Sequence, residues 1–294
     1  MGEVAWPVGV IGVGAMGSAV ARRLLGCGIE THVRDIRPEA MQGLASEGAL
    51  AHSSAAALAA RCRAFVVLVV DALQIEDVLF GVDGASKTLQ AGTLVILSST
   101  IAPADADSFA RRLGAQGALV LDAPISGGPE RAAAGTISMM VAGEPKAWDA
   151  AQAILPVLSG RVFRVSERPG DGARFKLVNN MLAGINLAAG AEAFALGRAL
   201  GLRAAMLNEV ISASSGAIWI VTERMQRVLA GDTRAQAATR MLAKDLGLLQ
   251  ALAQETGMAV PFTNQAHARF QSLMQAGLGD VDDSVLIRQD GAGE

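Results

Sequence analysis

Tyrosine is absent from this chain of 294 residues, and cysteine and histidine are scarce. Without tyrosine, any mechanism in which a phenolic hydroxyl donates the proton is excluded. The two cysteines, Cys27 and Cys62, form no Cys-x-x-Cys pair, which argues against a zinc site and a disulfide framework, and we expect no metal site. The three histidines, His32, His52 and His267, are expected to be structural or exposed rather than catalytic.

A strong excess of charge of either sign is also lacking, since 25 basic and 28 acidic residues give a net charge of -3. This balance argues against a nucleic-acid or membrane-surface partner. Polar residues interrupt the apolar runs before the roughly 18 residues that a membrane span needs. No basic region followed by an apolar one stands at the start, so we expect no signal peptide. The two cysteines without a disulfide framework indicate a cytoplasmic location.

A glycine-rich motif lies near the start of the chain. The apolar run 8–11 precedes it, a good helix pattern over 16–25 follows, and a second strand is expected over 30–33. This order is typical of a dinucleotide-binding unit, in which glycines allow the tight turn and the close approach of a pyrophosphate to a helix N-terminus. The predicted cofactor loop is Gly12, Val13, Gly14, Ala15, Met16 and Gly17.

An acidic residue, Asp35, follows 23 positions after Gly12, where a carboxylate can hold the ribose 2′-hydroxyl of NAD. Arg34 and Arg37 flank it, and an arginine can accept the 2′-phosphate of NADP. The acid favours NAD, and NADP stays possible.

Strand-like and helix-like segments alternate up to about residue 165, and the pattern is helical from Gly170 onward. Such alternation predicts a parallel sheet covered on both faces. We therefore expect an α/β fold: a doubly wound, Rossmann-type sheet over 1–167, then an all-α domain over 168–294. The expected strands are 8–11, 30–33, 64–70, 93–97, 119–121, 138–142 and 162–165, and the helices include 16–25, 38–47, 55–61, 104–113, 145–158 and 172–200.

Only four of the 25 basic residues are lysines, and the other 21 are arginines. A lysine can give up its proton when it is desolvated, which an arginine cannot do. Lys176 lies near the start of the long helix, and Asn179 and Asn180 share its face at i+3 and i+4. This face can line a polar site, or the lysine can simply extend to solvent. Lys244 precedes Asp245 in another expected helix, where a solvated ion pair is the alternative.

Two further segments follow expected strands. Ser126, Gly127 and Gly128 lie in Asp122-Ala-Pro-Ile-Ser-Gly-Gly-Pro129, where backbone N–H groups can bind an anion or simply form a Gly-Pro turn. Thr100 follows the strand over 93–97, and such strand ends face the ligand crevice of open α/β sheets.

Together these motifs resemble those of the β-hydroxyacid dehydrogenase family, which includes 3-hydroxyisobutyrate dehydrogenase. The segments that carry the resemblance are Gly12–Gly17, Asp122–Gly128, Gly170-Asp-Gly-Ala-Arg-Phe-Lys-Leu-Val-Asn-Asn180 and Lys244-Asp-Leu246. Ala213-Ser-Ser-Gly216 with Trp219, and Gly279-Asp-Val-Asp-Asp-Ser284, look most like the L-threonate dehydrogenase branch.

Two departures from the common family pattern qualify the resemblance. Arg131 replaces a frequent glycine and again favours the threonate branch over hydroxyisobutyrate itself. Val69-Val70 replaces the usual Leu-Pro, which can alter contacts to the cofactor. Imine reductases share the architecture but typically replace the catalytic lysine, so Lys176 argues against them.

The resemblance implies hydride transfer between nicotinamide and a small hydroxy acid of the L-threonate or 3-hydroxyisobutyrate type. It implies that Lys176 is the general acid/base and that Asn180 holds the substrate hydroxyl. The other implied residues are Ser126, Gly127, Gly128, Asn179 and Trp219 for the substrate, and the glycine loop, Asp35, Val70, Thr100 and Lys244 for the cofactor.

Two alternatives stay open from the sequence: an NADPH-dependent semialdehyde reductase and a non-catalytic NAD-binding sensor. The long helix and its small residues also predict a homodimer or homotetramer joined through the helical domain.

Overall fold

The computed structural model describes residues 4–289, which divide into two compact units between Lys176 and Leu177. The domain limits given above stay a prediction. The strands are β1 (Val8–Ile11), β2 (Thr31–Arg34), β3 (Leu50–Ala51), β4 (Ala64–Val67), β5 (Leu94–Leu97), β6 (Leu119–Asp122), β7 (Ile125–Ser126), β8 (Ser138–Ala142) and β9 (Arg161–Ser166).

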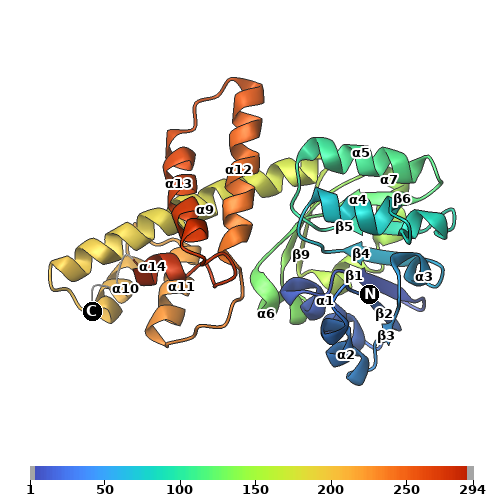
Figure 1. The fold of residues 1–294 in the computed structure, drawn as a ribbon, viewed down its shortest axis with the longest axis horizontal. Coiled ribbons are helices and arrows are strands. Elements are labelled where there is room, and N and C mark those ends of the chain that lie inside the picture. The colour runs from blue at the N-terminus through green and yellow to red at the C-terminus, as the bar shows by residue number, and fades with distance from the viewer. Residues whose placement is uncertain (1–3, 290–294) are drawn as a thin grey trace. The chain divides into compact units, whose positions relative to one another are not determined.

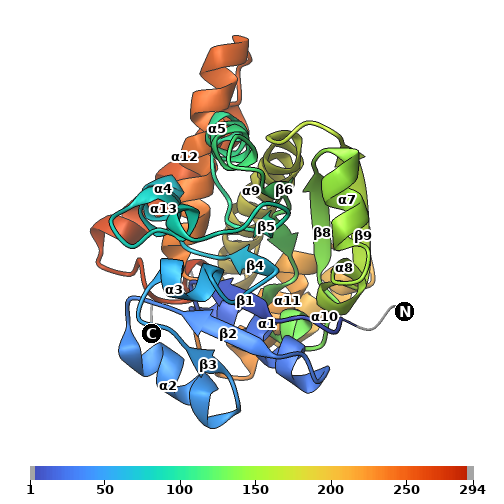
Figure 2. The same ribbon diagram turned by 90° about the vertical axis from the view of Figure 1, so that its right-hand side faces the viewer.

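The helices of the first unit alternate with these strands (Figures 1 and 2). They are α1 (Ala15–Gly26), α2 (Pro38–Ser46), α3 (Ala55–Ala59), α4 (Ala72–Phe80), the 3-10 turn η1 (Ala85–Lys87), α5 (Pro103–Gly114), α6 (Gly128–Ala133), α7 (Pro145–Ala151) and α8 (Leu155–Leu158). The helices that follow are α9 (Asp171–Ala199), α10 (Ala204–Ser212), α11 (Trp219–Leu229), α12 (Thr239–Thr256), α13 (Pro261–Gln275) and α14 (Val285–Gln289).

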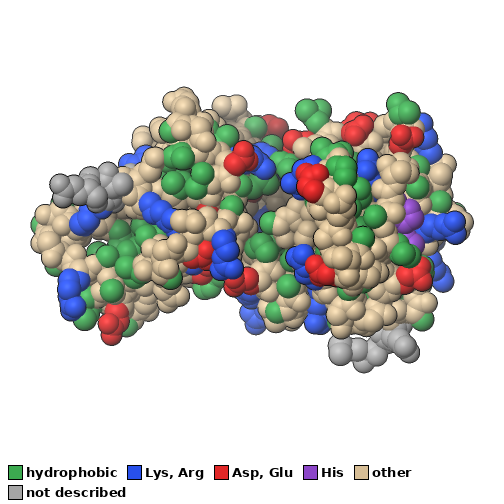
Figure 3. All heavy atoms as spheres, turned by 60° about the horizontal axis from the view of Figure 1, so that its bottom comes forward, with side chains coloured by type: hydrophobic (Ala, Val, Ile, Leu, Met, Phe, Trp, Pro, Cys, Tyr) green, Lys and Arg blue, Asp and Glu red, His purple; other side chains and the backbone are tan. Residues whose placement is uncertain are grey.

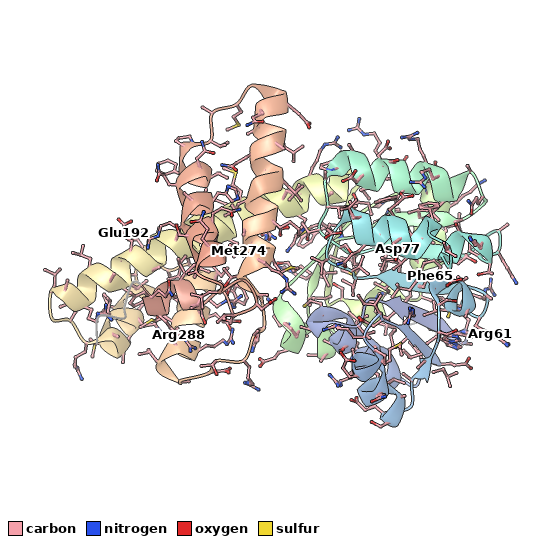
Figure 4. All side chains as sticks on the ribbon, in the orientation of Figure 1. Arg61, Phe65, Asp77, Glu192, Met274 and Arg288 are labelled. Atoms are coloured by element: carbon pink, nitrogen blue, oxygen red, sulfur yellow. The ribbon has the colours of Figure 1, made fainter. Side chains whose placement is uncertain are left out.

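The sheet has the order β3-β2-β1-β4-β5-β6-β8-β7, with β9 beside β8. The strands from β3 to β6 are parallel, whereas β8 runs antiparallel to β6 and β7. Alternate residues of β4 point to opposite faces. Val66 packs in the core under α1 and α2, and Phe65, labelled in Figure 4, packs in the core with α3, α4 and α5. This double burial explains the continuous apolar strands and confirms the predicted doubly wound α/β fold.

Several elements differ from the sequence-based expectations. Helix α4 was not predicted, although the side chain of Asp71 caps it by accepting a hydrogen bond from Gln74 N. The expected helix 145–158 is two helices, because Pro156 lacks the N–H that a continuous helix needs there. The expected strand 64–70 ends at Val67, after which the chain leaves the sheet.

From α9 onward the described chain contains helices and a single isolated β-bridge, which confirms the helical region. Three glycines of α9 let three other helices approach its backbone. A Cβ at Gly184 would lie 2.9 Å from Leu246 of α12, one at Gly190 2.6 Å from Val221 of α11, and one at Gly197 2.4 Å from Leu207 of α10. Helices α12 and α13 run side by side as a hairpin (Figure 1).

Buried ion pairs hold the end of the described chain against α11. Arg224 pairs with Asp283, and Arg227 Nη1 lies 3.1 Å from Asp282 Oδ2. Burial raises the pKa of the Asp283 carboxyl, and the Arg224 guanidinium opposes that rise. The motif Gly279–Ser284, which resembles the threonate branch, therefore also has a structural role. We call its two ion pairs with α11, Arg224–Asp283 and Arg227–Asp282, the buried clamp.

On the visible face in Figure 3, acidic and basic side chains are interspersed over the described residues, in keeping with the near-neutral net charge. Among residues 4–289, we find no helix with the length and apolar character to cross a bilayer.

Candidate active site

The predicted cofactor residues of the first unit follow the carboxyl ends of neighbouring parallel strands. Because β1, β2, β4, β5 and β6 are parallel, these ends lie along one edge of the sheet. In open α/β sheets this edge is where ligands bind. The residues that follow these strands are Gly12–Gly17, Asp35, Val70, Thr100 and Ser126.

The three glycines of the first loop have distinct surroundings. Gly12 has φ +87°, and a Cβ there would lie 2.8 Å from the backbone of Leu68. A Cβ at Gly17 would lie 1.9 Å from Gly12 O, so helix α1 could not pack on the loop. At Gly14 the nearest atom to an added Cβ is Arg37 Nη2 at 3.7 Å, so the backbone there is open to approach by a ligand.

Asp35 ties the glycine loop to the end of β2. Its Oδ2 accepts from Val13 N at 2.8 Å, and its Oδ1 accepts from Arg37 N at 2.9 Å and Arg37 Nε at 3.2 Å. Burial alone would raise the pKa of this carboxyl, but these hydrogen bonds together hold it below its usual value. A carboxylate has about four acceptor positions, so one remains on Oδ2 for a ribose hydroxyl.

The loops after β4 and β5 are joined to each other. Ser99 Oγ donates to Val69 O at 2.7 Å, and Val70 N donates to Gln74 Oε1 at 2.9 Å. Thr100, partly buried, follows directly. These bonds fix the backbone around two predicted cofactor residues, Val70 and Thr100.

The predicted substrate motif is a strand, a tight turn and a helix. Ser126 belongs to β7, Gly127 precedes α6 with a φ value of +136°, and Gly128, the first residue of α6, has a φ value of +79°. Arg131 of α6 packs its Cδ 3.3 Å from where a Cβ of Gly127 would lie, and its guanidinium donates to Thr136 O at 2.9 Å. The sequence predicted the turn but not the helix that follows it.

Asp122 has a role that sequence reasoning missed. Its Oδ2 accepts from Gly170 N at 2.8 Å and Ala173 N at 2.9 Å, so it caps the start of α9. Burial raises its pKa to about 6, against the opposing effect of those hydrogen bonds. A Cβ at Gly172 would lie 2.6 Å from Asp122 O, which explains the glycine there. The strand that leads into the substrate motif therefore anchors the helix that carries Lys176.

Lys176 and Asn180 lie one turn apart on α9, and each side chain is 8 % exposed. This burial argues against the alternative of a lysine extending to solvent. Asn179 is exposed, although its Nδ2 donates to Asn180 Oδ1 at 3.2 Å. Lys176 and Asn180 are thus buried, whereas Asn179 is exposed and contacts Asn180, so the three polar residues do not form one equally buried face.

Asp245 of α12 is a second residue that the sequence did not single out. Its Oδ2 accepts from Asn180 Nδ2 at 2.6 Å, and its Oδ1 lies 2.8 Å from Lys244 Nζ. The ion pair that the sequence analysis gave as the alternative for Lys244 is present, with a partly exposed ammonium and a buried carboxylate. Gly184, one turn after Asn180 on α9, is covered by Leu246 of α12. Only the tertiary structure could have revealed this contact, because 65 positions separate Asn180 from Asp245.

Trp219 is the first residue of α11 and is 57 % exposed. Its role in binding substrate stays a prediction. Two of the histidines lie elsewhere: His32 is buried, its Nδ1 is 2.7 Å from His52 Nε2, and its Nε2 is 2.8 Å from Glu30 Oε1. These contacts between His52, His32 and Glu30 lie around the start of β2, whereas Asp35 follows the end of that strand. This position agrees with a structural role for the two histidines.

Comparisons with known proteins match both parts of the chain. The pattern described as the NAD binding domain of 6-phosphogluconate dehydrogenase matches residues 7–166, and that described as NAD-binding of NADP-dependent 3-hydroxyisobutyrate dehydrogenase matches 170–289. L-threonate dehydrogenase of Cupriavidus necator is 41 % identical over 281 residues, covering 96 % of this chain and 95 % of that protein. Mitochondrial 3-hydroxyisobutyrate dehydrogenase of Drosophila melanogaster is 32 % identical, covering 95 % and 87 %.

Among solved structures, a 3-hydroxyisobutyrate dehydrogenase from Salmonella typhimurium superposes with a TM-score of 0.90 at 37 % identity. The match covers 97 % of this chain and 99 % of that one. The glycine loop and the α9 motif lie inside the matched lengths. The chain therefore belongs to the 3-hydroxyisobutyrate dehydrogenase-like family of β-hydroxyacid dehydrogenases and is an NAD(P)-dependent hydroxy-acid oxidoreductase.

Proposed function

We propose that this enzyme interconverts a small polyhydroxy acid of the L-threonate type and its oxo acid, with Lys176 as general acid/base. One observation carries the proposal: Lys176 and Asn180 are buried one turn apart on α9, and Asn180 is held by a buried carboxylate. Buried polar groups are costly unless polar partners or a polar ligand replace the lost water, and a lysine near an amide on an otherwise apolar helix suits such a ligand.

The residues of the first unit fit a dinucleotide. The open backbone at Gly14 and the first turn of α1 would take the pyrophosphate, and the remaining acceptor position of Asp35 would take a ribose hydroxyl. We assign Val70 and Thr100 to the nicotinamide half and Lys244 to the cofactor side. When bound, the nicotinamide accepts or supplies the hydride.

Lys176 moves the proton. In oxidation a neutral Lys176 Nζ takes the proton of the substrate hydroxyl while the carbon loses its hydride. In reduction the ammonium returns that proton and stabilises the negative charge that develops on oxygen. Asn180 holds the reacting oxygen, since an amide can donate a hydrogen bond to it.

Ser126, Gly127 and Gly128 are proposed to bind the substrate carboxylate, with Asn179 and Trp219 as further substrate contacts. Support comes from the positive φ angles of the two glycines, which turn successive N–H groups toward one side. Arg131, packed on Gly127, adds a positive charge next to this turn. That charge and the 41 % identity to an L-threonate dehydrogenase favour a hydroxylated acid over hydroxyisobutyrate.

We further propose that two or four copies associate through α9. Apolar side chains more than half exposed recur along this helix at Phe175, Val178, Leu182 and Leu196. Their spacings of three, four and fourteen residues keep them on one face of the helix, which a second copy can cover. A cytoplasmic location is proposed from the two free cysteines.

The test of this function measures the absorbance of reduced nicotinamide with L-threonate, its stereoisomers, 3-hydroxyisobutyrate and L-serine, each with NAD and with NADP. We expect the highest kcat/KM with L-threonate and NAD. Turnover of 3-hydroxyisobutyrate above that of all sugar acids would overturn the substrate assignment, and no turnover in either direction would overturn the proposed reaction.

A further inference from the structure

We infer that Asp245 is a positioning residue, which fixes the amide of Asn180 so that one Nδ2 proton stays available to the reacting oxygen. This inference rests on the proposed function of Asn180. The observation behind it is the buried 2.6 Å hydrogen bond from Asn180 Nδ2 to Asp245 Oδ2.

The charge of Asp245 determines which way the amide faces. An ionised carboxylate only accepts hydrogen bonds, so the amide nitrogen of Asn180 must face it, and the oxygen cannot. Turning the amide by 180° would bring Oδ1 of Asn180 against a negative oxygen and lose a charge-assisted hydrogen bond. The Nδ2 group has two protons, and Asp245 takes one of them.

The orientation matters for the proposed reaction because the substrate oxygen becomes more negative during reduction. A donor at this position stabilises that charge, whereas a carbonyl oxygen would repel it. With one Nδ2 proton bonded to Asp245, Asn180 has its second N–H for this oxygen, and its Oδ1 already accepts from Asn179 Nδ2. Without that carboxylate, both amide orientations become accessible.

Close helix packing keeps the two residues together. Gly184 lies one turn after Asn180 on α9, and Leu246 lies next to Asp245 on α12. Because Gly184 has no Cβ, the side chain of Leu246 reaches the backbone of α9. Asp245 is therefore held at a fixed distance, and its carboxylate is 5 % exposed.

The same carboxylate also contacts Lys244, whose Nζ lies 2.8 Å from Oδ1. Asp245 could thus act through Lys244 on the cofactor, or through Asn180 on the substrate. The two routes differ in what they change: the first changes cofactor affinity, and the second changes kcat at saturating cofactor.

The experiment compares Asp245→Asn, which keeps the shape and removes the charge, with Glu255→Gln, an exposed carboxylate on the same helix. We expect Asp245→Asn to lower kcat by about 10- to 100-fold, the scale of a misplaced reacting group, with the Kd for reduced cofactor unchanged. The double variant Asn180→Ala/Asp245→Asn should be no slower than Asn180→Ala alone, because both changes remove one function. Additive losses, or a raised cofactor Kd shared with Lys244→Met, would overturn the inference.

A second measurement needs neither turnover nor a folded Asp245 variant. The chain has five asparagines, so the side-chain amides of ¹⁵N-asparagine-labelled protein can be assigned by NMR with Asn180→Ala as reference. We expect one Nδ2 proton of Asn180 to be shifted downfield and protected from exchange. Exchange as fast as that of the exposed Asn179 would refute the hydrogen bond. Because this readout is independent of the reaction, a failure of the proposed function remains distinguishable from a failure of this inference.

Discussion

Arg37 and Asp35 form an ion pair at 3.2 Å beside the glycine loop, and the guanidinium is about half exposed. The Asp35 carboxylate suits the ribose hydroxyls of NAD, and the Arg37 guanidinium suits the 2′-phosphate of NADP. The two residues that favour different cofactors are therefore in direct contact.

Removing the acid should shift the cofactor preference. Asp35→Ser is expected to lower kcat/KM with NAD and raise it with NADP, because the negative charge next to the 2′ position is lost while Arg37 is released. Asp35→Ser/Arg37→Ala, which lacks the base as well, should lose the gain with NADP. An unchanged ratio of the two kcat/KM values in Asp35→Ser would contradict this role.

Lys176→Ala should lower kcat by about 10²–10⁴-fold, the usual contribution of general acid–base catalysis. Lys176→Arg should fail as well, because arginine keeps the charge and does not exchange the proton. The matched control is Lys146→Ala, an exposed lysine at the start of α7. Steady-state rates with saturating cofactor are the measurement, and near-normal turnover in Lys176→Ala would refute the assignment.

Asp122 should make stability depend on pH. Its pKa is raised from 3.8 to about 6 in the folded chain, so folding favours its protonated form. Its stabilising contribution is fully present below pH 3.8 and is lost as the pH rises through about 6. Relative to Asp122→Asn, wild type should lose about 2 kcal/mol of unfolding free energy between pH 4.5 and 7.5. Urea unfolding at the two pH values measures this, and equal pH dependence in both proteins would contradict it.

Breaking the buried clamp should destabilise the helical unit. Arg224→Met leaves the Asp283 carboxylate buried without its ion pair and should cost about 3–5 kcal/mol. The double variant Arg224→Met/Asp283→Leu should recover most of that loss, because no unpaired charge remains. Thermal unfolding of the three proteins is the test. A double variant less stable than Arg224→Met would contradict this prediction. It would mean that the free energy gained from the ion pair exceeds the cost of burying its two charges.

A charge on the exposed face of α9 should weaken association. Leu182→Glu is expected to shift the mass measured by light scattering at micromolar concentration toward that of one chain. The control is Leu229→Glu, an exposed leucine at the end of α11. A monomeric wild-type protein would refute the proposed oligomer.

The sequence predicted the fold class because two patterns in it are strong: the short apolar runs of the buried strands and the helical pattern of the second half. The buried parallel strands read as continuous apolar runs, and α9 was expected within one residue at each end. Short elements were harder to predict. Helix α6 begins with Gly128 and Pro129, which locally indicate a turn, and the sequence does not show the packing against α1 that accompanies the helix.

The site was predictable where chemistry and spacing are local, as at Gly12–Gly17 and along the first turns of α9. Asp122 and Asp245 were missed as individual residues because each acts on a backbone or side chain far away in sequence. A buried aspartate in an otherwise apolar segment was the available signal. Its partner could be found only from the fold.

The glycines of α9 also limit how this enzyme can be engineered. A methyl group added at Gly184, Gly190 or Gly197 would lie within 3 Å of a side chain of another helix, so any larger residue there requires that side chain to move. Libraries that seek new substrate ranges should therefore leave these three codons fixed and place diversity at exposed positions such as Trp219 and Arg131.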